Sequence, residues 1–174
     1  CAGTLQSNHR ILQGTGSTAT YAGTVTINST NSDANTTISM GVNGTSTYNG
    51  NIIVTNSGGS NGIYFNSNTN SSSSLAATRT ISISGAYSSG ILSLQRFTQL
   101  GATAQTLNTL TGTARLDIGP DAAFGGNVNF RAPRLFMNGG TFSGTATLEK
   151  TGANGDSGNG GNTFQGVTTI TNSG

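Results

Sequence analysis

The segment "GGTFSGTATLEKTG", residues 139–152, decides the fold of this chain. An aromatic residue, Phe142, is followed two places later by Gly144, and apolar residues then alternate with small polar ones. Because successive side chains of a β-strand point to opposite faces, this alternation predicts a short strand with one buried face. The segment ends in Glu149 and Lys150, the only adjacent opposite charges in the chain. It is therefore either a charged site or one unit of a repeat.

The same element occurs at five places, as an aromatic residue, any residue, a glycine, any residue and an alternating apolar pair. The copies are YAGTVTI from Tyr21, YNGNIIV from Tyr48, FGGNVNF from Phe124, FSGTATL from Phe142 and FQGVTTI from Phe164. A variant with one inserted residue, YSSGILSL, begins at Tyr87. The last three copies follow one another at a spacing of about 20 residues, and the earlier ones are spaced more widely. Periods of about 20 to 50 residues are typical of stacked solenoids, so the charged pair is interpreted as the end of a repeat strand.

This repeat predicts an all-β fold, a single right-handed parallel β-solenoid over residues 1–174 with about eight irregular coils and little or no helix. Coils stacked about 4.8 Å apart would form a rod roughly 40 Å long. The glycine after each aromatic is predicted to turn a corner in a left-handed conformation. The serine-rich stretch at 66–79 is predicted to be a loop bulging from one coil. Nine period-two pairs mark the strands: Val25 and Ile27, Ile38 and Met40, Ile52 and Val54, Ile81 and Ile83, Leu92 and Leu94, Leu116 and Ile118, Val128 and Phe130, Leu135 and Met137, and Ala146 and Leu148.

The composition excludes several classes of protein. Only 7% of the residues are charged, and the formal net charge is +2. The seven cations are scattered along the chain, whereas a nucleic-acid-binding protein clusters them on one face. The single cysteine, Cys1, excludes an internal disulfide, and no apolar run approaches the ~18 residues of a membrane span. Because the chain does not begin with Met, we expect a fragment of a longer repeat protein, with a lipid anchor on Cys1 as the alternative.

No residue is predicted to be catalytic, and none to bind a cofactor or a metal. Carbohydrate-degrading β-helix enzymes need clustered carboxylates, and of the five acidic residues only Asp117 and Asp121 lie close in sequence, separated by a Gly-Pro corner. His9 has no orienting acid near it. The segment "GANGDSGNGGN" at 152–162 resembles a calcium-binding repeat but carries one aspartate where that repeat needs one in every coil.

Ice binding is a further hypothesis, because it uses a flat face of regularly spaced Thr-x-Thr triplets. The chain contains several, such as Thr18-Ala19-Thr20 and Thr45-Ser46-Thr47. In the sequence these triplets do not recur once per coil at constant phase, which argues against this function.

The repeat resembles the autotransporter-associated β-strand repeats and the related repeats of very large secreted surface proteins, notably of Bacteroidota. The match is best over residues 140–174, where TLEKTG, a Gly- and Asn-rich run and NTFQGVTTI resemble a Leu-x-Lys-x-Gly strand followed by Gly-x-Asn-Thr-aromatic-x-Gly. The resemblance implies an extracellular right-handed β-solenoid stalk or adhesin segment, exported by an autotransporter route or the type IX system. It carries over no catalytic residue.

The sequence therefore predicts a non-enzymatic structural or adhesive segment of a long extracellular bacterial surface or filament-forming protein. The competing hypothesis is a β-helix module that binds or degrades carbohydrate. Three kinds of partner stay open: further coils of the same chain, end-to-end copies of it, and surface glycans or other cells. Neither nucleic acid nor a transmembrane segment is expected.

Overall fold

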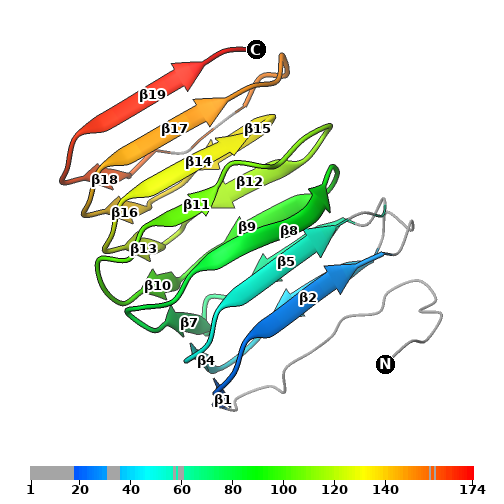
Figure 1. The fold of residues 1–174 in the computed structure, drawn as a ribbon, viewed down its shortest axis with the longest axis vertical. Helices are drawn as coiled ribbons and strands as arrows, with labels where there is room; N and C mark the ends of the chain where they lie inside the picture. The colour runs from blue at the N-terminus through cyan, green and yellow to red at the C-terminus, as the bar shows by residue number, and fades with distance from the viewer. Residues whose placement is uncertain (1–17, 31–35, 57, 59–60, 157, 159) are drawn as a thin grey trace.

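A computed structural model describes residues 18–30, 36–56, 58, 61–156, 158 and 160–174, and over these residues the chain is a parallel β-solenoid without helix (Figure 1). As the chain rises in Figure 1 it runs to the right on the near side and to the left on the far side, which is right-handed winding. The strands are β1 (Ala19–Tyr21), β2 (Val25–Ser29), β3 (Thr37–Met40), β4 (Thr45–Tyr48), β5 (Ile52–Asn56), β6 (Gly62–Phe65), β7 (Ser72–Leu75), β8 (Ile81–Tyr87), β9 (Ile91–Leu94), β10 (Phe97–Gln99), β11 (Gln105–Leu107), β12 (Arg115–Ile118), β13 (Ala123–Phe124), β14 (Val128–Ala132), β15 (Arg134–Met137), β16 (Thr141–Phe142), β17 (Ala146–Lys150), β18 (Thr163–Phe164) and β19 (Thr168–Asn172).

Within each sheet, a strand pairs in parallel with the strand one turn further along the chain. The first side of the solenoid is one sheet of seven strands, in the order β1-β4-β7-β10-β13-β16-β18. The second side holds two sheets, β2-β5-β8 and β11-β14-β17-β19, and the third side holds β3-β6-β9-β12-β15. The described residues thus make seven turns; the prediction of about eight coils was for residues 1–174, of which 1–17 lie outside the described part. All nine period-two pairs lie in strands.

The repeat aromatics form one column inside the first side. Tyr21, Tyr48, Phe124, Phe142 and Phe164 occupy the same register position, with Leu75 and Gln99 completing the column in the third and fourth turns. Neighbouring rings stack at centroid distances of 4.8 Å for Tyr21 and Tyr48 and 5.0 Å for Phe142 and Phe164. The interpretation of these aromatics as core residues is confirmed.

Tyr87 does not belong to this column, so its assignment as a sixth copy of the repeat is wrong. It ends β8 on the second side, opposite Asn56, and its hydroxyl donates to the Ile91 carbonyl at 2.7 Å. The position in the column is taken by Leu75 of the same turn. Successive members of the column lie further apart in the sequence before Phe124 than after it. Most turns are therefore longer than the last two.

The repeat glycines turn the corner between the first and second sides, but not in a left-handed conformation as predicted. None of the five repeat glycines has a positive φ; they are Gly23, Gly50, Gly126, Gly144 and Gly166. An added Cβ at Gly50 would instead lie 2.2 Å from the carbonyl carbon of Gly23 in the turn before. Glycine is required here because two backbones approach closely.

The prediction of a loop over 66–79 is wrong at its centre, where β7 takes its place in the first side. Ser73 is 2% exposed and Leu75 is fully buried. The Ser73 hydroxyl donates to the Asn66 Oδ1 at 2.9 Å, so this inward polar side chain has a partner inside the fold. Only the flanks of the segment form turns.

Candidate functional site

The charged pair that ends the segment 139–152 is not a site of two cooperating charges. Glu149 on β17 lies opposite Arg131 on β14 and pairs with it, with 3.1 Å between the Arg131 Nε and the Glu149 Oε2. The Ser173 hydroxyl donates to the other carboxylate oxygen at 2.7 Å. Lys150 instead donates from its Nζ to the Gly152 carbonyl. The two adjacent charges have separate contacts, as expected for neighbours in a strand.

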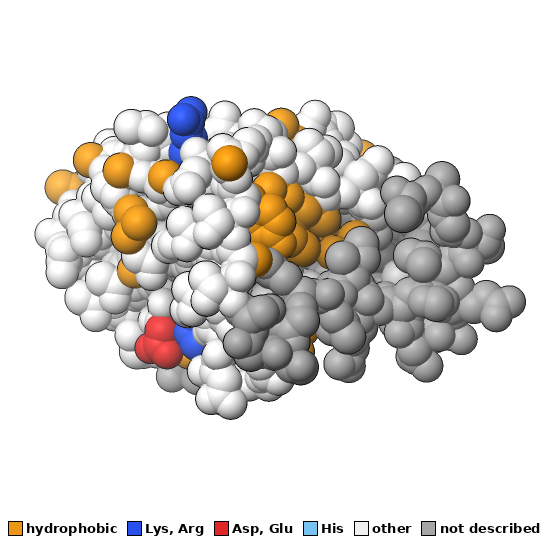
Figure 2. Space-filling view, turned by 90° about the horizontal axis from the view of Figure 1, so that it is seen from below, with side chains coloured by type: hydrophobic (Ala, Val, Ile, Leu, Met, Phe, Trp, Pro, Cys, Tyr) orange, Lys and Arg blue, Asp and Glu red, His pale blue; other side chains and the backbone are white. Residues whose placement is uncertain are grey.

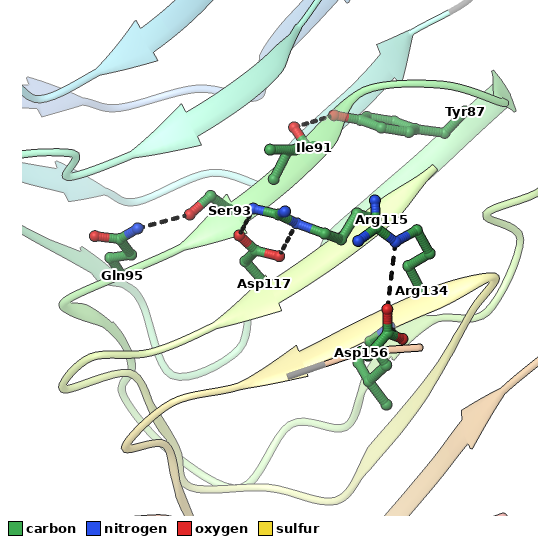
Figure 3. Close-up of polar contacts among 9 residues, drawn as sticks. Tyr87, Ile91, Ser93, Gln95, Arg115, Asp117, Arg134 and Asp156 are labelled. Atoms are coloured by element: carbon green, nitrogen blue, oxygen red, sulfur yellow. Dashed lines mark hydrogen bonds and ion pairs between the residues drawn. The ribbon is translucent and has the colours of Figure 1, made fainter. Parts of the chain in front are cut away.

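A charged cluster lies on the outer face of the third side, over β12 and β15 (Figure 3). Arg115 and Asp117 of β12 form a bidentate pair, with both nitrogen–oxygen distances at 2.6 Å. The Arg115 guanidinium lies over the Phe136 ring at 4.4 Å, and the Arg134 guanidinium lies 5.2 Å from the same ring. Burial raises the pKa of the Asp117 carboxyl, and the contact with Arg115 lowers it by less.

Asp156 closes the edge of this sheet instead of joining a metal site. Its Oδ2 accepts a hydrogen bond from the Leu135 amide of β15 at 2.8 Å, and its Oδ1 lies 3.3 Å from the Arg134 Nε. The carboxylate therefore takes the place of the carbonyl that a further strand would supply to Leu135. Among the described residues there is no group of three His, Cys, Asp or Glu side chains that could hold a metal ion.

The structure separates the two acids that the sequence places close together. Asp117 lies within β12 and is paired with Arg115, whereas Asp121 is exposed at the next corner with a φ of 57°. Asp121 has no ion pair with any described residue. The other candidates weighed from the sequence, Cys1 and His9, lie outside the described residues.

The first side carries two columns of outward side chains, most of them hydroxyl-bearing. The uneven spacing of the Thr-x-Thr triplets in the sequence conceals these columns. Thr18 and Thr20 of the first turn are in phase with Thr45 and Thr47 of the second, and Ser72 and Ser74 continue both columns in the third turn. The column through Thr20 goes on through Thr98, Ala123, Thr141 and Thr163. The other column stops at Arg96, so the paired array that ice binding would use covers three turns only.

The second side carries a shallow hollow that sequence reasoning missed. It lies over β11, β14 and β17 and is lined by two outward columns of three residues, Thr106, Asn129 and Thr147 beside Ala104, Asn127 and Thr145. Gln105 and Val128 form its floor. The sequence signal was present in the triplet Thr145-Ala146-Thr147, but its neighbours become visible only once the register of three turns is known.

One end of the molecule is poor in charge. The end of the molecule nearest β1 and β2 shows few charged side chains, and a group of hydrophobic side chains lies at its centre (Figure 2). Tyr21 and Val25 of this first turn are only partly buried against the core. No helix of the described residues is long and apolar enough to cross a membrane.

Comparison of the chain with models of protein families, with curated proteins and with solved structures finds no match. The functional argument therefore depends on the geometry of the solenoid itself.

Proposed function

We propose that this chain is a non-enzymatic structural and adhesive segment of a long extracellular bacterial surface protein. The observation that carries the proposal is the unbroken stacking of the first side, where one sheet runs through all seven described turns. Every turn is joined to the next by backbone hydrogen bonds, and the core columns continue across them. Each turn of such a rod is stabilised by the turn beside it. A rod of this kind is suited to holding an adhesive surface at a distance from the cell.

The state of the carboxylates supports a role without catalysis. Asp117, Glu149 and Asp156 are each paired with an arginine. A glycosidase needs two carboxyl groups that face one bond of the substrate from roughly 5 to 9.5 Å apart, one of them free to donate a proton. Carboxylates held as ion-pair and edge-closing groups are suited to fixing the outer layer of the sheets.

The last described turn supports a longer rod. Ile170 of β19 continues the column of Leu148 but is 70% exposed. Both sheets that contain β18 and β19 end there with an open strand edge. A further turn of the same rod would cover Ile170 and pair with these edges.

The proposal is tested on the cells that produce the protein. Antibodies raised against the 174-residue chain should label intact cells, and external protease should remove the label without lysis. Purified chain pulled from its two ends should unfold in successive small steps, because turns detach one at a time. Label that appears only after the cells are opened, or release of reducing sugar from polysaccharides by the purified chain, would contradict the proposal.

A further inference from the structure

We propose that the hollow on the second side binds a neutral glycan that lies across β11, β14 and β17. The inference gives a site to the adhesive part of the proposed function and rests on that part. The hollow is the concave part of an outer face, and ligands bind in concave sites lined by a few placed polar groups. Three strands contribute to it in register, so its two columns run along the axis of the solenoid.

The polar groups of the hollow are available to a ligand. Thr106, Asn129 and Thr147 are exposed, and none of their side chains makes a hydrogen bond with another described residue. Asn127 is fixed differently, because its Oδ1 accepts a hydrogen bond from the Thr145 amide at 2.9 Å. That bond leaves the Asn127 amide nitrogen to donate outward. Hydroxyl and amide groups both donate and accept, which is what the hydroxyls of a sugar require.

The floor of the hollow is rigid. Gln105 is fully buried at the step between β8 and β11, where its Oε1 accepts from the Ile81 amide at 2.9 Å and its Nε2 donates to the Arg79 carbonyl at 3.0 Å. These bonds join the two sheets of the second side at the point where they have no common ladder. Val128 beside it is 3% exposed and lies on β14, which pairs with a strand on each side. A ligand binding here does not have to order the protein first.

The charge around the hollow favours a neutral partner. All the residues that line it are uncharged. The nearest charges on the same face, one outward position beyond Asn129 and Thr147 on their strands, are Arg131 and Glu149, which neutralise each other in an ion pair. The strands are about 4.8 Å apart, close to the length of one pyranose unit, so successive sugar rings can meet successive strands.

The test is a binding titration of the chain with hexasaccharides of β-1,4-linked and β-1,3-linked glucose, with a hexasaccharide of galacturonic acid as the anionic comparison. Calorimetry gives the affinity, and amide chemical shifts locate the site. The variants are Asn129→Ala and Thr147→Ala, and the matched control is Thr98→Ala on the outward column of the first side. All three residues are at least partly exposed, so the variants keep the fold, which circular dichroism checks.

We expect a neutral hexasaccharide to bind and to shift the amides of β11, β14 and β17. Each hollow variant should weaken binding about three- to tenfold, which is the loss of one or two hydrogen bonds, while Thr98→Ala binds as the parent chain does. The inference is overturned if neither neutral hexasaccharide binds, if both hollow variants bind like the control, or if the uronic acid binds more tightly. The surface-labelling and pulling experiments do not depend on this site, so its failure leaves the structural role standing.

Discussion

Replacing Gly50 with alanine tests whether close approach of two backbones is the reason for the glycine in each repeat. The added Cβ would lie 2.2 Å from both the carbonyl carbon and the carbonyl oxygen of Gly23, and 2.5 Å from the Thr24 amide nitrogen. Real Cβ atoms essentially never lie closer than 3.0 Å to such atoms, and every one of these atoms is backbone, so the two turns must separate at this corner. Overpacking of this kind costs about 1 to 3 kcal/mol.

Gly23→Ala is the matched control, because it occupies the same repeat position in the first described turn and a Cβ there meets no atom within 4 Å. With ordinary φ and open space, alanine should stabilise the chain by about 0.4 to 1 kcal/mol through the unfolded state. Thermal unfolding followed by circular dichroism measures both changes. At about 2 to 4 °C per kcal/mol for a chain of this size, the Gly50→Ala midpoint should fall by about 2 to 12 °C. A Gly50→Ala variant as stable as Gly23→Ala would refute the close-approach argument.

Three further predictions concern the core and the outer cluster. Phe142→Ala should lose about 3 to 5 kcal/mol in urea unfolding, more than Phe142→Leu, because its fully buried ring stacks between two others. Asn66→Ala should lose about 2 to 4 kcal/mol by the same measurement, because the buried Asn66 amide donates to two carbonyls and accepts from Ser73. The backbone of Asn66 also has a φ of 56°, which strains alanine. Asn66→Gly adopts that φ without strain and should lose less. Burial raises the pKa of Asp117 in the folded state, so the folded chain holds this proton more tightly than the unfolded chain does. The contribution of this carboxyl to stability is therefore lost as the pH rises from about 4 through the raised pKa. Asp117→Asn removes this contribution, so the slope of unfolding free energy against pH should become more positive in that range, and an unchanged slope would contradict the assignment.

The strands were predictable from local pattern, but the assignment of residues to columns was not. Alternation over a few residues is enough to place Ile52 and Val54 in one strand face, and the structure agrees. Membership of a column depends on the length of the whole turn, which varies along the solenoid because the corners absorb the difference. Tyr87 matches the aromatic motif, but it falls in the sequence between Leu75 and Gln99, two successive members of the column. It therefore lies on another side of the solenoid.

Buried polar residues explain why the sequence wrongly predicted a loop at the centre of 66–79. Ser73, Asn66 and Gln99 are each at most 2% exposed, yet in sequence they are indistinguishable from the residues of a solvated loop. Each one is satisfied inside the fold; the Gln99 Oε1, for example, accepts from the Gly125 and Gly126 amides at 3.2 and 3.3 Å. Such partners commonly belong to a different turn, so a window of sequence around the residue does not contain the information that it is buried.

The same dependence on register explains why the sequence predicted the fold but did not reveal the candidate glycan site. Inward positions are restricted by the column above and below them, whereas outward positions such as Thr106 and Asn129 have no packing role to restrict their identity. A ligand that spans three strands selects those outward residues together, even though a whole turn of chain separates each of them from the next. Insertions at the corners would lengthen the turns without moving the columns. A site of this kind can therefore persist while its spacing in the sequence changes, and it is found only by aligning strands on their inward residues.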